Sequence, residues 1–245
     1  GSGVYHLNQQ RGLFGVSSFR VSADGKWVAY QAYQDASHVG LDLYTVPIDA
    51  TDFAWRLNDT LVGDGDYRFD ADADRVLFIG SPTLGFSKHG LYSVARSGCS
   101  VPVLVHGTQP PFSHVTSYQS LRGRGQVLFV GDIIQTGGYE FYSSAYRPGL
   151  DGLNPAIGPV QGGTLVTVAG FGLGPDTKVF FGSARAATTF IDANTLSVVA
   201  PPRAVQPGTG GARAQRTPNE PFVVDVRVMD CGAEAVLANG YTYVP

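Results

Sequence analysis

Five aspartates lie close together in the chain, at positions 64, 66, 70, 72 and 74. Hard cations such as Ca²⁺ bind several carboxylate oxygens, so Asp70, Asp72 and Asp74 are weak candidate calcium ligands. The spacing does not complete an EF-hand loop, because no glycine follows the third aspartate and position 12 of a loop begun at Asp70 is Ser81. Aspartate is also common in turns, where it hydrogen-bonds nearby backbone. The turn interpretation is preferred, and no metal or other cofactor is expected.

Residue types that bind metals or act in catalysis are not spaced as known metal or catalytic sites require. The five histidines lack the His-x-x-x-His or Cys-His spacing of zinc sites; they are His6, His38, His89, His106 and His114. No Gly-x-Ser-x-Gly nucleophile elbow is present, and "GFGLGPD" precedes a predicted strand where a phosphate-binding loop precedes a helix. The sequence therefore predicts no catalytic residues, and we expect the protein not to be an enzyme.

The two cysteines, Cys99 and Cys231, lie in predicted turns of different parts of the chain. They can form one disulfide, which is plausible for an exported protein, or remain two independent thiols. Both alternatives stay open.

A 12-residue segment occurs three times in the first half of the chain. The copies are "FRVSADGKWVAY" (19–30), "YRFDADADRVLF" (67–78) and "YQSLRGRGQVLF" (118–129), each with an aromatic residue at both ends and an apolar pair before the last one. A tyrosine follows each copy after 13 or 14 residues, at Tyr44, Tyr92 and Tyr142. Their spacing matches the repeat of about 40 to 50 residues shown by four-stranded propeller blades.

The first copy resembles a blade of the TolB-like (WD40-like) β-propeller family. The family pattern is an aromatic residue, Ser-Pro-Asp-Gly-Lys, an apolar pair and a D-L/I-Y-V strand, and Ser22-Ala23-Asp24-Gly25-Lys26 departs from it only by alanine in place of proline. The second and third copies degrade this turn. The resemblance implies about three four-stranded blades over residues 1–149, which make an incomplete toroid. Its first and last blades are expected to expose apolar residues such as Val28, Val76, Leu77, Val127 and Leu128.

The second half has a different character after the Gly- and Pro-rich segment 147–159. "GLNPAIGPVQGGTLVTVAGFGLG", "KVFFGSARAATTFIDANTLSVVAPP" and the closing "NGYTYVP" resemble an IPT/TIG domain, which implies an immunoglobulin-like sandwich over residues 150–245. Valines alternate with polar residues in "FVVDVRVM", as in an antiparallel strand with one solvated face. Tyr241 and Tyr243 are expected to face the core. The predicted fold class is all-β, with a partial β-propeller followed by this sandwich.

The sandwich departs from the family in one long connection, residues 203–221. Its three arginines, Arg203, Arg213 and Arg216, lie among Gly, Pro and Thr with few apolar side chains. Loops longer than about 12 to 15 residues are usually functional or disordered. The arginines are therefore interaction candidates for an acidic partner surface, and a loop without function is the alternative.

Composition excludes several kinds of partner. The net charge is −3, which argues against nucleic acid, and no apolar run reaches the length of a membrane span. Both resemblances imply a non-catalytic interaction or scaffold protein of the periplasm or the cell surface. Its expected partner is a protein, a larger assembly or a second copy that covers the open blade faces. The alternatives are a carbohydrate-binding accessory module and the non-catalytic part of a larger hydrolase.

Overall fold

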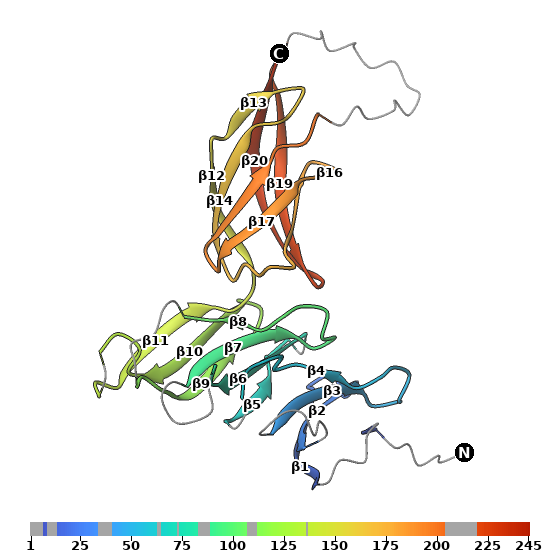
Figure 1. The fold of residues 1–245 in the computed structure, drawn as a ribbon, viewed down its shortest axis with the longest axis vertical. Helices are drawn as coiled ribbons and strands as arrows, with labels where there is room; N and C mark the ends of the chain where they lie inside the picture. Colours follow the sequence, from blue (N-terminus) through green and yellow to red (C-terminus); the bar gives the residue numbers. More distant parts are fainter. Residues whose placement is uncertain are drawn as a thin grey trace. The chain divides into compact units, whose positions relative to one another are not determined.

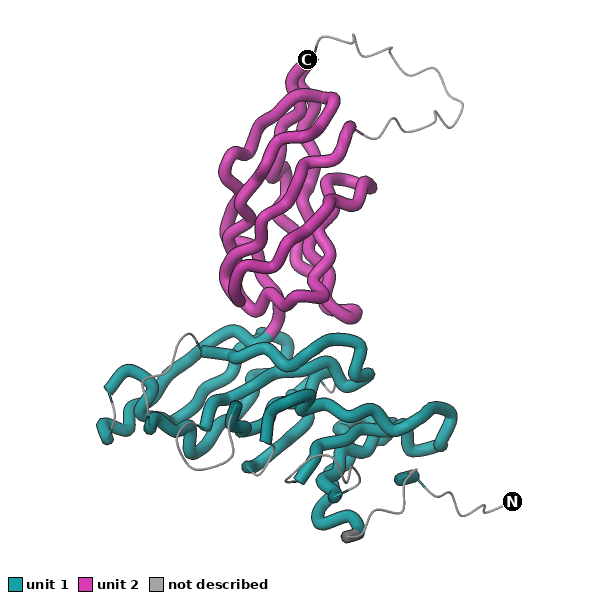
Figure 2. Tube along the Cα trace, in the orientation of Figure 1, with its two compact units in different colours: residues 1–146 teal, residues 147–245 magenta. Residues whose placement is uncertain are grey.

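The computed structural model describes residues 7–8, 14–33, 41–62, 65–72, 74–82, 89–106, 112–135, 137–203 and 220–245. The regular secondary structure in these ranges consists of β-strands alone, which confirms the predicted all-β class. Two compact units divide the chain, residues 1–146 and residues 147–245, and each is described by itself (Figure 2). The described residues include no helix that is long and apolar enough to cross a bilayer.

Three antiparallel sheets build the first unit, and within each sheet the strands neighbour one another in chain order (Figure 1). The first sheet contains β1 (Phe14–Val21), β2 (Trp27–Tyr33), β3 (Asp42–Pro47) and β4 (Trp55–Arg56). The second contains β5 (Tyr67–Phe69), β6 (Arg75–Gly80), β7 (Gly90–Ala95) and β8 (Val103–Leu104). The third contains β9 (Val115–Leu121), β10 (Gln126–Gly131) and β11 (Glu140–Ala145). Four strands per blade were predicted; the first two sheets have four, and the third has three among the described residues. The closure of blades into a toroid stays a prediction.

The turn between β1 and β2 shows why the repeated segment forms a hairpin. The Ser22 N–H donates to the Trp27 carbonyl at 2.9 Å, and the Trp27 N–H donates to the Ser22 hydroxyl oxygen at 2.9 Å. The Asp24 carboxylate accepts from the Ser22 hydroxyl at 2.5 Å and from the Lys26 N–H at 3.1 Å. Gly25 has a φ of 69°, which glycine adopts without the steric cost of a Cβ. The Ser22 hydrogen bond is the main reason that the pKa of Asp24 falls to about 2.

The second sheet is covered on both faces, because it lies between the first and the third. All residues of β6 and β7 are buried, whereas β10 alternates between buried and partly exposed residues. One buried cluster joins Ala29 and Leu43 of the first sheet to residues of the second. Another joins Leu77 and Leu91 of the second sheet to residues of the third.

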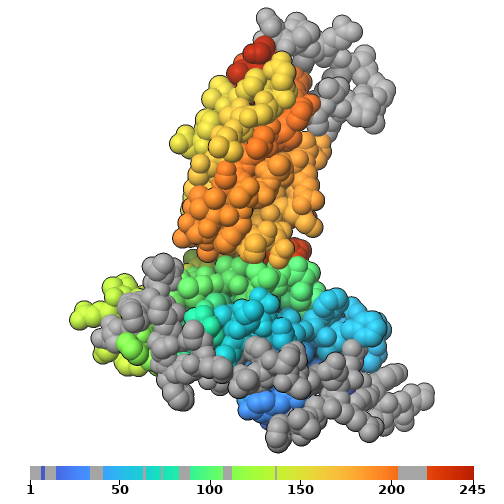
Figure 3. Space-filling model, in the orientation of Figure 1, coloured from blue at the N-terminus to red at the C-terminus, as the bar shows by residue number. Residues whose placement is uncertain are grey.

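The second unit consists of two sheets, and the chain passes several times from one sheet to the other, as in an immunoglobulin-like sandwich. One sheet has the order β12 (Gly149–Asn154), β14 (Leu165–Phe171), β18 (Thr195–Val199) and β17 (Ala187–Asp192). The other has the order β13 (Ile157–Pro159), β20 (Ala233–Val244), β19 (Phe222–Asp230), β15 (Lys178–Phe181) and β16 (Ala184–Arg185). All neighbouring pairs are antiparallel except β13 and β20, which are parallel. The space-filling view shows one outer face of this unit, in yellow to red (Figure 3).

Apolar side chains from both sheets meet in the core of the second unit. Val166 and Val168 of β14 and Val226 and Val228 of β19 are all 0% exposed. The predicted core positions of Tyr241 and Tyr243 are confirmed by exposures of 0% and 1%. The Tyr243 hydroxyl donates to the Pro201 carbonyl at 2.7 Å, and burial raises the pKa of this tyrosine to about 12.

Candidate interaction surface

Each sheet of the first unit carries a stacked pair of aromatic rings on one face. The two rings come from residues directly opposite each other on neighbouring strands, with centroids 5.3 to 5.5 Å apart and planes inclined by 18° to 22°. The pairs are Tyr30–Tyr44, Phe78–Tyr92 and Phe129–Tyr142. We call this side of each sheet its aromatic-pair face and the other side its reverse face.

The aromatic-pair faces of the second and third sheets are covered by the reverse face of the preceding sheet. Phe78 and Tyr92 belong to the cluster that contains Ala29 and Leu43 of the first sheet. In the same way Phe129 is clustered with Leu77 and Leu91 of the second sheet. The same kind of contact therefore occurs twice along the chain.

The aromatic-pair face of the first sheet is different, because among the described residues no sheet precedes it. Phe19 begins the first copy of the repeat and is 66% exposed, whereas its counterparts Tyr67 and Tyr118 are 3% and 5% exposed. Val21 and Val16, also on β1, are 49% and 44% exposed. We call this surface the open face.

The hydroxyls of the two buried counterparts reach the preceding sheet. Tyr67 Oη lies 2.8 Å from Ser18 Oγ, and the Tyr118 hydroxyl donates to the Leu77 carbonyl at 2.9 Å. Burial raises the pKa of both tyrosines, and that of Tyr118 well above its usual value. On the open face the counterpart of these tyrosines is Phe19, which has no hydroxyl and so needs no hydrogen-bond partner.

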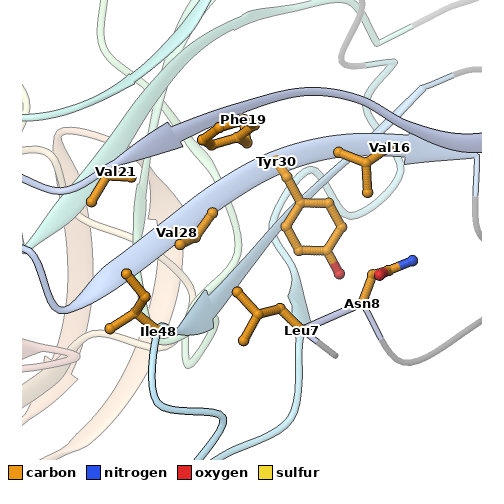
Figure 4. Close-up of a pocket in the computed structure, with 8 residues that line it drawn as sticks. All are labelled: Leu7, Asn8, Val16, Phe19, Val21, Val28, Tyr30 and Ile48. Atoms are coloured by element: carbon orange, nitrogen blue, oxygen red, sulfur yellow. The ribbon is translucent and has the colours of Figure 1, made fainter. Parts of the chain in front are cut away.

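A recess of about 360 Å³ lies in the open face (Figure 4). Its lining is apolar except for the side chain of Asn8 and the hydroxyl of Tyr30. The lining residues come from β1, from β2, from the position directly after β3 and from residues 7–8. The lining residues are Leu7, Asn8, Val16, Phe19, Val21, Val28, Tyr30 and Ile48. Such a surface suits apolar side chains of a partner, since it offers few groups that could hydrogen-bond a polar ligand.

The reverse face of the third sheet is also accessible. Phe141 of β11 is 70% exposed, and Leu128 and Val130 of β10 are partly exposed although their neighbours Val127 and Phe129 are buried. The first unit therefore ends in apolar surface on both of its outer sheets. The residues predicted for this surface were mostly wrong: Leu128 is partly exposed, but Val28, Val76, Leu77 and Val127 are buried. The exposed Phe19, Val21 and Phe141 were not predicted.

Two of the three candidate calcium ligands, Asp70 and Asp72, accept hydrogen bonds from other groups of the protein. One oxygen of Asp70 accepts from the backbone N–H groups of Asp74 and Arg75, and the other accepts from the Tyr146 hydroxyl at 2.9 Å. The Asp72 carboxylate accepts from the Gly123 N–H at 3.0 Å. Within the described ranges no group of three or more His, Cys, Asp or Glu side chains is arranged to hold a metal ion.

The described histidines serve in packing and backbone contacts. The rings of His89 and His114 stack with centroids 5.2 Å apart. His106 is 5% exposed, and its Nε2 accepts from the Leu91 N–H at 3.1 Å. His6 and His38 lie outside the described residues.

Of the three candidate arginines, only Arg203 is described. Its guanidinium carbon lies 4.1 Å from the centroid of the Phe222 ring, and its N–H donates to the Val160 carbonyl at 2.9 Å. Arg213 and Arg216 lie outside the described residues, as does most of the long connection.

Both Cys99 and Cys231 are disulfide-bonded. The described part of the chain contains no free cysteine. Cys231 has a φ of 48°, as expected of a residue in a tight turn.

Comparison with protein families identifies the second unit: the IPT/TIG family matches residues 148–242. This segment is an IPT/TIG domain. The match spans the strands from β12 to most of β20. It agrees with the resemblance seen in the sequence, and the IPT/TIG domain is thus the part of the chain whose fold family is shown.

Three solved structures show a distant likeness to the chain. Two are extracellular regions of plexin A4, and both are 10% identical to this chain. The first has a TM-score of 0.37, and the alignment covers 97% of this chain and 16% of the plexin chain. The second has a TM-score of 0.35, and the alignment covers 100% of this chain and 20% of the plexin chain. The third is the gamma-CGTase from Alkalophilic bacillus clarkii, with 14% identity, a TM-score of 0.28 and coverage of 74% and 26%. This chain thus spans between 16% and 26% of those proteins. No curated protein sequence matches it.

Proposed function

We propose that this chain is a non-catalytic interaction protein that binds a protein partner on the open face of its first sheet. The IPT/TIG domain supports this proposal, because domains of this family generally mediate protein–protein contacts. We also propose that the first unit is an arc of TolB-like propeller blades. The in-order meanders and the repeated sheet-to-sheet contact support that interpretation.

The exposure of Phe19 carries the proposal. Its 66% exposure beside an apolar recess contrasts with the burial of Tyr67 and Tyr118 at the same repeat position. Contiguous exposed apolar surface is a mark of protein interaction sites, whereas isolated exposed residues are ordinary. Val21 and Val16 extend the surface along β1.

A protein partner is favoured over a carbohydrate for this surface. Sugar hydroxyls need hydrogen-bonding groups, and the recess offers mainly the polar atoms of Asn8 and Tyr30. In the IPT/TIG domain, Tyr241 and Tyr243 are buried and cannot form an aromatic platform. The disulfide bonding of both cysteines supports an extracytoplasmic location, in the periplasm or at the cell surface, because disulfides persist in oxidising compartments.

The test compares partner capture by three immobilised proteins: the unchanged chain, Phe19→Arg and Leu165→Arg. Leu165 is a matched control, since it is also 66% exposed but lies in the IPT/TIG domain. Proteins from an extract of the source organism that bind the unchanged chain and Leu165→Arg should be lost from Phe19→Arg, and mass spectrometry identifies them. Equal capture by all three would show that the open face does not bind the partner.

A further inference from the structure

One chain carries both surfaces of a sheet-to-sheet contact, one on its first sheet and one on its third. We infer that the open face binds the reverse face of the third sheet of a second copy of this chain. The inference rests on the proposed function, because it names a partner for the same face. The two contacts already present within the first unit define what such a contact requires.

The receiving surface is nearly the same on the first and second sheets. Val28, Tyr30, Tyr44 and Val46 occupy the strand positions that Val76, Phe78, Tyr92 and Val94 occupy in the second sheet. In the second sheet these residues are buried in a cluster with two residues of the preceding sheet, Ala29 and Leu43. In the first sheet the equivalent residues form a buried cluster of their own, against which Leu7 and Ala54 pack, and Val28 and Tyr30 of this cluster line the recess. Leu7 thus takes part of the place that the preceding sheet takes in the second sheet, while Phe19 and Val21 of β1 stay exposed. The open face therefore reproduces a surface that the protein already covers with the reverse face of a sheet.

The inserting surface recurs in the same way. On the reverse face of the second sheet, Leu77 lies opposite Ser93 and Ile79 lies opposite Leu91. On the third sheet, Leu128 lies opposite Ser143 and Val130 lies opposite Phe141. Both sheets thus carry one cross-strand pair of leucine and serine and, next to it, one cross-strand pair of two apolar residues. The reverse face of the third sheet has the chemistry of the one that covers Phe129 inside the unit.

Phe141 is the main difference, because it replaces the smaller Leu91. It is 70% exposed and projects the largest apolar side chain of that face. A recess of about 360 Å³ in the open face has room for it, since an apolar cavity of about 150 Å³ suffices to bind benzene. Phe141 of one copy can therefore insert into the recess of the open face of the other copy.

The contact is heterologous, since different surfaces of the two copies meet. Such contacts close into rings or continue as open chains, depending on the rotation between copies. Two first units joined at both ends contain six sheets, twice the three of a single first unit. Closed propellers have about four to eight blades, so a two-copy ring is within the known range.

The test is light scattering of the 245-residue chain from about 1 to about 100 μM, the range in which weak to moderate complexes form. The unchanged chain should at least double its mass from 25.9 kDa as concentration rises. Phe19→Arg and Phe141→Arg should each stay monomeric, because each removes one side of the contact. Both residues are more than half exposed, so the variants should fold. Leu165→Arg is the control and should associate like the unchanged chain.

Mixing the two variants distinguishes this contact from other kinds of association. Phe19→Arg retains an intact third sheet and Phe141→Arg retains an intact open face, so an equimolar mixture should form a dimer although neither variant does so alone. If two open faces bound each other instead, the mixture would form no dimer and Phe141→Arg alone would associate like the unchanged chain. Either result would overturn the inference. An unchanged chain that stays monomeric at about 100 μM would also overturn it. If such a monomer still lost its partner on Phe19→Arg, the proposed function would stand with a different partner.

Discussion

Replacing Leu77 and Leu128 by alanine should have very different consequences for the stability of the first unit. The two leucines hold the same position in the second and third copies of the repeat, on the reverse faces of β6 and β10. Leu77 is 1% exposed, because the third sheet covers it, whereas Leu128 is partly exposed. The same chemical change is therefore made in a covered and in an uncovered sheet.

The magnitude follows from the burial of each side chain. Leu→Ala removes roughly three carbon groups, worth about 0.8 kcal/mol each when fully buried, and leaves a cavity where neighbours cannot relax. For Leu77 we expect a loss of about 3 kcal/mol in the free energy of unfolding, within the range of core leucines. For Leu128 we expect about 1 kcal/mol or less, because solvent already reaches it and can fill the space.

Urea unfolding followed by tryptophan fluorescence measures this difference. The chain has only two tryptophans, and both Trp27 and Trp55 lie in the first sheet, so the signal reports the first unit. With a slope near 2 kcal/mol/M, the midpoint should fall by about 1.5 M for Leu77→Ala and by about 0.5 M or less for Leu128→Ala. Protein concentrations below about 1 μM keep association out of the measurement. Equal losses would show that the reverse face of the third sheet is covered within the monomer.

Three further predictions concern the turns and the cysteines. The pKa of Asp24 is lowered to about 2 in the folded protein, so its stabilisation is complete above its usual pKa of 3.8 and is lost as the pH falls toward 2. Asp24→Asn should therefore weaken the loss of stability between pH 5 and pH 2, by less than about 1 kcal/mol because the side chain is exposed, and urea titrations at several pH values measure this. Gly162→Ala should lower the melting temperature of the IPT/TIG domain more than Gly163→Ala: both have positive φ, but only at Gly162 would a Cβ meet backbone, at 2.5 Å. Peptide mapping without reductant should recover Cys99 and Cys231 in one linked species, and separate thiol-labelled peptides would contradict an intrachain bridge.

The hairpins of the first unit could be predicted because their signals are local. The segment around Asp24 and Gly25 encodes its turn through side-chain hydrogen bonds and a positive φ within five residues. In the structure the two aromatic ends of each copy lie opposite each other on neighbouring strands. The IPT/TIG domain was recognisable for the same reason, since its glycines, prolines and closing strand lie at family positions.

The coverage of each sheet face could not be predicted from the same signals. Leu77 and Leu128 have the same local pattern and differ only in whether another sheet packs over them. Phe19 and Tyr67 are equally good strand residues, yet one is exposed and the other buried. A sequence repeat defines which faces are alike, whereas burial depends on which sheets are present on either side. This is why the candidate interaction surface could be located only in the structure.

The complete burial of β6 and β7 has a consequence for how the first unit opens. Backbone amides exchange with solvent deuterium when local unfolding exposes them, and segments with the most buried contacts exchange last. The second sheet packs against both of its neighbours, whereas the first and third each pack against one. The amides of Leu77 and Tyr92 should therefore outlast those of Tyr30 and Phe129 in exchange measured on the monomer. Capping the open face with another sheet would bring the protection of Tyr30 close to that of Tyr92.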